Sequence, residues 1–178
     1  MSATEYVILV NKDDQEIGTA EKLAAHKQCL LHRAFSVFIY KEAPEIEILL
    51  QQRADDKYHA GGLWTNTCCS HPRPSESILA AGRRRLKEEL GLTAELQSLG
   101  WFHYIAHFDN GLSENEIDYV LLGKLEPDAK ITLNPAEVKA YRWITPAELK
   151  EELARAPHTF TPWFEQALTL AQQSLDQI

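Results

Sequence analysis

Five side chains that can bind a metal ion lie in three short stretches of the sequence: His26, His32, His71, Glu114 and Glu116. Three imidazoles and two carboxylates suit a divalent transition metal, because Mg²⁺ prefers a shell made of oxygen ligands. The set therefore predicts a site that binds Mn²⁺ or Zn²⁺ in preference to Mg²⁺.

A thiol lies close to this set in the sequence. Cys69 precedes His71 by two residues, and alternate side chains of an extended strand lie on one face. The same rule places Glu114 and Glu116 on one face, roughly 7 Å apart along the chain. Cys69 and Glu116 could then flank a substrate next to the metal.

Each of these residues also has a simpler interpretation. A single histidine near an apolar segment is more often a hydrogen-bonded structural residue. We expect the four other histidines to be of that kind: His59, His103, His107 and His158. The acidic pair around Asn115 could be a polar turn, and Cys68 could be a small buried apolar residue.

The elements that position these side chains are predicted from residue type and spacing. Strands are predicted at residues 5–10, 34–40, 46–51, 63–69, 99–108, 116–125 and 138–144. The clearest helix is predicted before Gly91, a residue that readily ends helices. Its apolar face is formed by Ile78, Gly82, Leu86 and Leu90, which recur every four positions.

Two further helices are predicted near the C-terminus. One begins at Thr145, where Thr-Pro-Ala-Glu forms a capping box with proline in the first turn, and the other follows Thr161-Pro162. Strands, one long helix, more strands and then helices are the order of an α+β protein. We therefore predict a single domain over residues 1–178, with a mixed β-sheet flanked by helices.

Composition excludes several classes of partner. Eighteen Lys and Arg against 26 Asp and Glu leave a formal charge of −8, which disfavours nucleic-acid binding. The chain has no apolar run of the ~18 residues that a membrane helix needs and no signal-peptide pattern, so we expect a cytoplasmic protein without membrane contact. Three cysteines, two of them adjacent, do not form a paired disulfide framework. The modest size and acidic composition are compatible with a monomer or weak dimer.

The charges between residues 70 and 92 are spaced in a way that resembles the Nudix box. That box reads Gly, five residues, Glu, seven residues, then Arg-Glu-U-x-Glu-Glu-x-Gly-U, where U is a large aliphatic residue. This chain keeps the arginine, the paired glutamates and the last glycine, but it has Ser70 for the first glycine and Arg85 for a glutamate. Arg85 exchanges a metal-binding carboxylate for a cation that can bind phosphate, which weakens hydrolysis and strengthens diphosphate binding as hypotheses.

Glu89 of the same helix borders the predicted buried face, where a carboxylate needs a cation. A metal ion that bridges Glu89 to a substrate diphosphate would supply one. The alternative is an ordinary solvated helix face with exposed ion pairs, formed by Arg84, Arg85, Glu88 and Glu89.

Several longer motifs together resemble type 1 isopentenyl-diphosphate isomerases. In chain order they are EKLAAH from Glu21, His32, Gln52-Arg53-Ala54 with Lys57, WTNTCCSHP from Trp64, ELG from Glu89, Tyr104, ENE from Glu114 and TPW ending at Trp163. The one departure in spacing is that His26 and His32 are six residues apart, where seven are expected.

The resemblance implies a Nudix-like enzyme of isoprenoid biosynthesis that interconverts isopentenyl and dimethylallyl diphosphates. It assigns proton transfer to Cys69 and Glu116, with Tyr104 either hydrogen-bonded to Glu116 or supplying a proton. A divalent metal on the histidine and glutamate set would hold Glu116 in position.

The same resemblance implies how an allylic or homoallylic diphosphate is bound. Four cations would pair with its phosphates: Lys22, Arg53, Lys57 and Arg85. One Mg²⁺ on Glu89 would assist them. Trp163 would face the positive charge of a tertiary carbocation.

Two rival functions remain open from the residues. A Nudix hydrolase of a nucleoside diphosphate derivative would share the fold and the metal at Glu89, but hydrolysis needs no thiol. A regulatory Nudix-like module would bind metal without any chemistry following.

Overall fold

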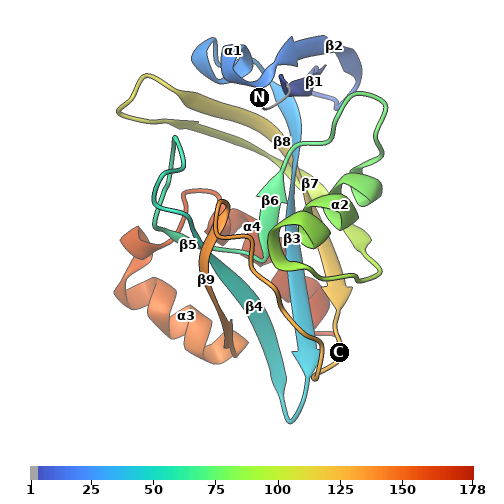
Figure 1. Ribbon diagram of the computed structural model, residues 1–178, viewed down its shortest axis with the longest axis vertical. Helices are drawn as coiled ribbons and strands as arrows, with labels where there is room; N and C mark the ends of the chain where they lie inside the picture. The colour runs from blue at the N-terminus through green and yellow to red at the C-terminus, as the bar shows by residue number, and fades with distance from the viewer. Residues whose placement is uncertain (1–3) are drawn as a thin grey trace.

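The chain folds around a nine-stranded mixed sheet in the computed structural model, which describes residues 4–178 (Figure 1). The strands are β1 (Tyr6–Val10), β2 (Glu16–Glu21), β3 (His32–Glu42), β4 (Ile46–Arg53), β5 (Trp64–Thr65), β6 (Cys68–Ser70), β7 (Gln97–His107), β8 (Ser113–Lys124) and β9 (Val138–Ile144). The helices are α1 (Lys22–Lys27), α2 (Ile78–Leu90), α3 (Pro146–Arg155) and α4 (Phe164–Leu175), with a short 3-10 turn at Pro157–Thr159. This architecture confirms the predicted α+β class and mixed sheet.

β3 is the strand on which the others are arranged. β8 pairs with it in parallel, from His32 opposite Glu116 to Tyr40 opposite Lys124, and so occupies one edge of β3. β1, β4 and β6 pair antiparallel and share the other edge. β3 therefore joins segments from both halves of the chain.

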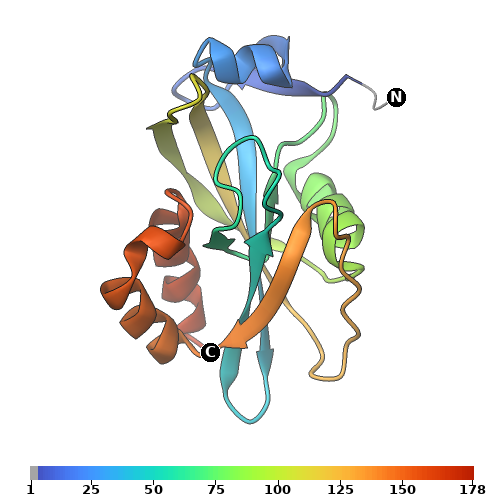
Figure 2. The same ribbon diagram turned by 60° about the vertical axis from the view of Figure 1, so that its left-hand side comes forward.

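Helices cover the two faces of this sheet, as Figure 2 shows. On one face Phe35 and Val37 pack in a cluster with Leu86 of α2. On the other face Phe38 packs against Phe164 of α4, with ring centroids 6.1 Å apart. Because both faces are buried, β3 reads as a nearly continuous apolar run rather than an alternating one.

α2 lies close to the sheet because Gly82 faces it. A Cβ atom at Gly82 would come within 2.7 Å of Leu121 Cδ1 on β8. Ser77 caps the start of the helix, and Gly91 ends it with a φ of 67°, in the left-handed region predicted for it. The last turns of α2, which carry the charged residues, lie beside β6 (Figure 1).

β2 and α1 were not predicted from the sequence, and α1 carries both Lys22 and His26. β2 pairs with β1, but almost all of its side chains are exposed, so it has no apolar alternation. α1 has only six residues and no side-chain N-cap. Helices of this length depend on tertiary packing rather than on local propensity.

Within residues 4–178, every helix is too short or too polar to span a bilayer.

The capping box at Thr145 is present, and it predicts a measurable contribution to stability. The Thr145 hydroxyl accepts a hydrogen bond from Glu148 N at 3.2 Å, and the Glu148 carboxylate accepts one from Thr145 N at 3.1 Å. Thr145→Ala should lower the free energy of unfolding by about 1 kcal/mol, measured by urea denaturation followed by circular dichroism. Thr169→Ala on the exposed side of α4 is the control, and an equal loss there would contradict the capping interpretation.

Candidate active site

One pocket collects most of the residues that the sequence singles out. Nine of them line it: Lys22, Arg53, Lys57, Cys69, His71, Arg85, Glu114, Glu116 and Trp163. The other four are at most 4% exposed and lie next to lining residues: His26, His32, Glu89 and Tyr104. The fold therefore brings together side chains from α1, β3, β6, α2, β7, β8 and the start of α4.

Two buried histidines each keep one nitrogen free. Nδ1 of His26 lies 2.6 Å from Lys22 O, and Nδ1 of His32 lies 2.8 Å from Leu30 O. A carbonyl oxygen can only accept a hydrogen bond, so each Nδ1 carries a proton and Nε2 is the nitrogen left to bind another group. Among residues 4–178, neither Nε2 atom meets hydrogen-bond geometry, although Glu116 Oε1 lies 3.3 Å from that of His32. In the neutral ring each Nε2 carries a lone pair that a metal ion could accept.

His71 and Glu116 complete a four-residue group with these histidines. One donor atom from each of His26, His32, His71 and Glu116 lies within 4.8 Å of all the others. Glu116 Oε1 is 3.0 Å from His71 Nε2 and 3.3 Å from His32 Nε2. Such separations fit donors that share one ion at metal–ligand distances near ~2 Å. The six-residue spacing of the first two histidines thus leaves both in the group.

Burial and the contacts with Glu116 together set the protonation of the group. Burial lowers the pKa of His26 to about 4 and the pKa of His71 to about 3. Burial would lower the pKa of His32 as well, but the contact with Glu116 outweighs it and raises that pKa, so a bound metal would have to displace a proton there. Burial would raise the pKa of Glu116, but the contacts with His32 and His71 outweigh it and lower that pKa. Neutral imidazoles and an ionised carboxylate are the forms that bind metal. The residues present therefore fit a divalent metal ion.

Glu114 lies beside this group but outside it. Its carboxylate pairs with His59, whose ring stacks on that of His26 with centroids 5.8 Å apart. Burial raises the pKa of Glu114, and the neighbouring charge of Glu116 adds to the rise. The role of Glu114 as a metal ligand therefore stays a prediction.

Cys69 and Glu116 reach the pocket from strands on opposite edges of β3. Cys69 lies on β6 opposite Ser36, and Glu116 lies on β8 beside His32. Partners in register point to the same face of a sheet, and His32 and Ser36 are an even number of residues apart. The two side chains thus lie on one side of the sheet.

Cys69 is half-buried and lines the pocket. Burial raises the pKa of the Cys69 thiol to about 12, although Arg53 Nη1, 3.9 Å from the sulfur, opposes the rise. At neutral pH the site therefore offers a protonated thiol at Cys69 and an ionised carboxylate at Glu116. One is a proton donor and the other a proton acceptor.

Tyr104 and Trp163 form an aromatic wall of the site. Tyr104 lies on β7 opposite Glu116, and its ring centroid is 6.1 Å from that of Trp163. The Tyr104 hydroxyl is buried without a hydrogen-bond partner among the described residues. Of the two roles predicted for it, the hydrogen bond to Glu116 is not formed, and the supply of a proton stays a prediction. Trp163 Nε1 donates a hydrogen bond to Asn66 Oδ1 at 3.3 Å, which fixes the orientation of the indole. The Arg53 guanidinium lies 5.4 Å from the centroid of the Trp163 ring.

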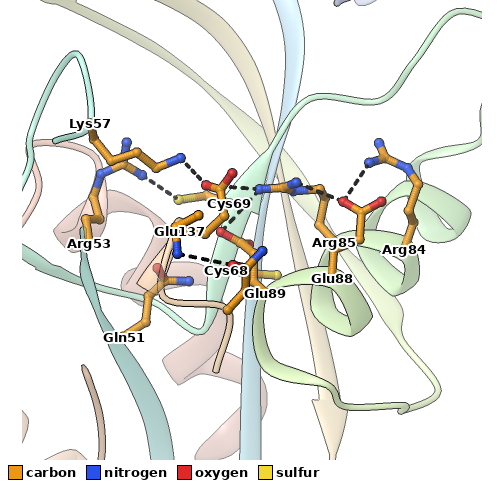
Figure 3. A network of polar contacts seen from close by, with 12 residues as sticks. Gln51, Arg53, Lys57, Cys68, Cys69, Arg84, Arg85, Glu88, Glu89 and Glu137 are labelled. Atoms are coloured by element: carbon orange, nitrogen blue, oxygen red, sulfur yellow. Dashed lines mark hydrogen bonds and ion pairs between the residues drawn. The ribbon is translucent and has the colours of Figure 1, made fainter. Parts of the chain in front are cut away.

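Two of the residues predicted to bind the diphosphate, Lys57 and Arg85, both contact Glu137, which lies in the loop before β9 (Figure 3). Lys57 pairs with Glu137, and Arg85 lies 3.4 Å from both Glu137 and Glu89. Lys22, from α1, pairs with Glu5 at 3.0 Å. These cations gather at one pocket from separate elements.

Glu89 is a buried carboxylate that is only partly neutralised. It is 3% exposed, and its Oε2 atom has no hydrogen-bond partner among residues 4–178. Burial raises the pKa of Glu89, which the Arg85 guanidinium opposes. An additional cation at Glu89 would relieve this cost, as the sequence predicts.

Several pocket residues were given no functional role from the sequence, among them Asp118, Glu137 and His59, the last of which was expected to be a structural histidine. Asp118 accepts a hydrogen bond from Ser36 Oγ at 3.0 Å, and it continues the alternation of acidic residues along β8. That alternation could have revealed it. His59 and Glu137 lie in loops, where no periodicity marks them.

Comparisons with known proteins agree with this geometry. A NUDIX domain model matches residues 30–164. An isopentenyl-diphosphate Delta-isomerase of Aliivibrio fischeri (strain MJ11) is 51% identical over 166 residues, which cover 90% of this chain and 91% of the relative. The chain belongs to the isopentenyl-diphosphate Delta-isomerase family. A family member from Burkholderia multivorans is 48% identical over 160 residues, which cover 90% of this chain and 89% of that one.

Solved structures extend the likeness of this isomerase-family chain to the wider Nudix fold. A Deinococcus radiodurans crystal structure matches with a TM-score of 0.67 and 21% identity, covering 94% of this chain and 98% of that one. An Ap4A hydrolase of C. elegans in a binary complex matches with a TM-score of 0.60 and 23% identity, covering 82% and 98%. At these identities the likeness shows the fold alone.

Removal of one imidazole tests the metal group. His32→Gln should lower the affinity for Zn²⁺ and for Mn²⁺ by at least about tenfold, because it removes a pre-positioned neutral donor. The measurement is isothermal titration calorimetry on chelator-treated protein. His158→Gln, at an exposed histidine outside the pocket, is the matched control. Equal affinities of the two variants would contradict the site.

The raised pKa of Cys69 predicts its reactivity. Alkylation by iodoacetamide should accelerate about tenfold per pH unit between pH 7 and 10, because only the thiolate reacts and its fraction grows in that proportion below the pKa. Peptide mass spectrometry can follow this one cysteine in the intact chain. Arg53→Gln should slow the reaction at each pH, since Arg53 favours the thiolate. A rate that levels off near pH 8 would contradict the raised pKa of Cys69.

Proposed function

We propose that this protein interconverts isopentenyl diphosphate and dimethylallyl diphosphate, with residues 1–178 acting as one Nudix-type isomerase domain. The observation that carries this proposal is that Cys69 and Glu116 lie on one side of the sheet, on strands that pair with opposite edges of β3. Moving a carbon–carbon double bond requires a proton donor at one carbon and a proton acceptor at another. Membership of the isomerase family supports the same reaction.

In this mechanism Cys69 and Glu116 share one transferable proton. One group protonates the terminal alkene carbon of isopentenyl diphosphate, which leaves a tertiary carbocation on the neighbouring carbon. The other group removes a proton from the carbon on the far side, and the electrons of that C–H bond form the new double bond. In the reverse direction each group acts on the same carbon as before, but the donor becomes the acceptor and the acceptor becomes the donor. The proton ends on the second group, so the pair must exchange it before the next turnover.

The aromatic wall stabilises the carbocation and keeps water away from it. The face of a Trp attracts a nearby positive charge by about 2 kcal/mol when desolvated, which gives Trp163 this role. Tyr104 and Trp163 are both 4% exposed. Exclusion of water matters because water would trap the cation as an alcohol. The free hydroxyl of Tyr104 can supply or relay a proton beside Glu116.

Four charged side chains that line the pocket would hold the diphosphate: Lys22, Arg53, Lys57 and Arg85. A divalent metal, Mn²⁺ or Zn²⁺, held by the four-residue histidine and glutamate group with Glu114 beside it, would supply the positive charge that orients Glu116. Mg²⁺ at Glu89 would add charge for the phosphates. Anchoring the diphosphate fixes the alkene between the two proton-transfer groups.

Incubation of isopentenyl diphosphate with the protein in heavy water tests the reaction. We expect dimethylallyl diphosphate that carries solvent deuterium, detected by mass spectrometry. Cys69→Ala and Glu116→Gln should each lower the rate by at least about 100-fold, because each removes one of two required proton-transfer groups. Thermal unfolding of both variants verifies that they fold. Absent or unlabelled product from metal-loaded wild-type protein would refute the proposal.

A hydrolase assay separates this function from its rival. Nucleoside diphosphate derivatives are supplied under the same conditions, and we expect no phosphate release at rates typical of enzymes. Rapid release without isomerisation would favour a Nudix hydrolase instead.

A further inference from the structure

The carboxylate of Glu137 lies between two of the cations proposed to bind the diphosphate. Its Oε2 atom contacts Lys57 Nζ and lies 3.4 Å from Arg85 Nη2, as Figure 3 shows. Lys57 comes from the loop between β4 and β5, and Arg85 comes from α2. One oxygen therefore joins two cations from separate elements, which is the contact that a phosphate oxygen would make.

The backbone holds Glu137 firmly in this place. Its amide donates to Asn134 O at 3.0 Å, and its carbonyl accepts from Ala54 N at 3.1 Å. Burial would raise the pKa of Glu137, but Lys57 outweighs it, so that pKa is lowered and the carboxylate is ionised. Only 25% of the side chain is exposed, so solvent screens the pair incompletely.

In the proposed reaction, the Glu137 carboxylate would affect how tightly both substrate and product bind. Substrate and product carry the same diphosphate, so contacts with that group stabilise both equally. Binding of this uniform kind lowers KM without raising kcat, and it slows release of the product. Several charge-assisted contacts in one partly buried pocket would bind a diphosphate tightly. A competing negative charge would weaken substrate and product binding alike.

We propose that Glu137 is an internal competitor of the diphosphate, which binds Lys57 and Arg85 and so sets the affinity low enough for product to leave. This inference rests on the proposed diphosphate substrate. Glu137 is therefore an affinity-setting residue and takes no part in proton transfer.

The test measures binding of inorganic diphosphate to the full chain by isothermal titration calorimetry, with and without Mg²⁺. Glu137→Gln should tighten binding by about tenfold in both conditions, since it removes a charge that faces the anion. The KM for isopentenyl diphosphate should fall by a similar factor, while kcat stays equal or falls. Glu88→Gln is the matched control, because Glu88 lies 2.8 Å from Arg85 but is exposed and outside the pocket. It should change binding by less than about twofold, as for other exposed ion pairs.

Unchanged or weaker binding in Glu137→Gln would overturn the inference, and weakening confined to Mg²⁺ would make Glu137 a metal ligand instead. If Glu137→Gln does not fold, Glu137→Asp provides the test. Its shorter carboxylate should tighten binding by a smaller factor, and equal or weaker binding would count against the inference. If the wild-type protein binds diphosphate but does not isomerise the substrate, the proposed function is wrong and this inference is unaffected. If the protein isomerises the substrate but Glu137→Gln leaves the affinity for diphosphate unchanged, this inference is wrong and the proposed function stands.

Discussion

The parallel pairing of β3 with β8 is the constraint on which the site depends. It places Glu116 beside His32 and leaves the other edge of β3 to the short strand that carries Cys69. A shift of one residue in this register would turn every acidic side chain of β8 to the opposite face. Such a shift is costly because the opposite face of the sheet packs in the apolar cluster of Phe35, Val37 and Leu86, where a carboxylate of β8 would be buried without a partner.

Burial then decides the chemistry that these residues can perform. The same desolvation that keeps the imidazoles of His26 and His71 neutral keeps the Cys69 thiol protonated. Glu116 is ionised in spite of burial because two histidines contact it. Ordinary side chains thus acquire the opposite protonation states that proton transfer between two carbons requires.

Several cations of the pocket are paired with carboxylates of the same chain. Buried or half-buried charges are costly unless a partner faces them. Lys57 and Arg85 have Glu137, and Lys22 has Glu5, so these cations that can bind a diphosphate already have partners within the chain. The arrangement lets the protein keep a cluster of positive charge without uncompensated repulsion. It also means that an anionic substrate exchanges one set of ion pairs for another rather than forming new ones outright.

The sequence by itself determined the elements whose signals are local. The helix ending at Gly91, the capping box at Thr145 and most strands follow from spacing and residue type over a few positions. The segment at residues 63–69 was predicted as one extended stretch, but it contains two short strands, β5 and β6, which pair with different partners. α1 and β2 were missed because neither has a cap or an apolar repeat.

For the candidate site too, the sequence identified some features and the tertiary structure decided the others. The residues that carry the motifs were identified in the sequence because their types and order match a family pattern. Only the tertiary structure decided which of them meet: that Glu114 pairs with His59, that Tyr104 does not bond to Glu116, and that Glu137 lies between two cations. These contacts join loops and strands far apart in the chain. No local periodicity encodes such distances, because they are set by packing of the whole sheet.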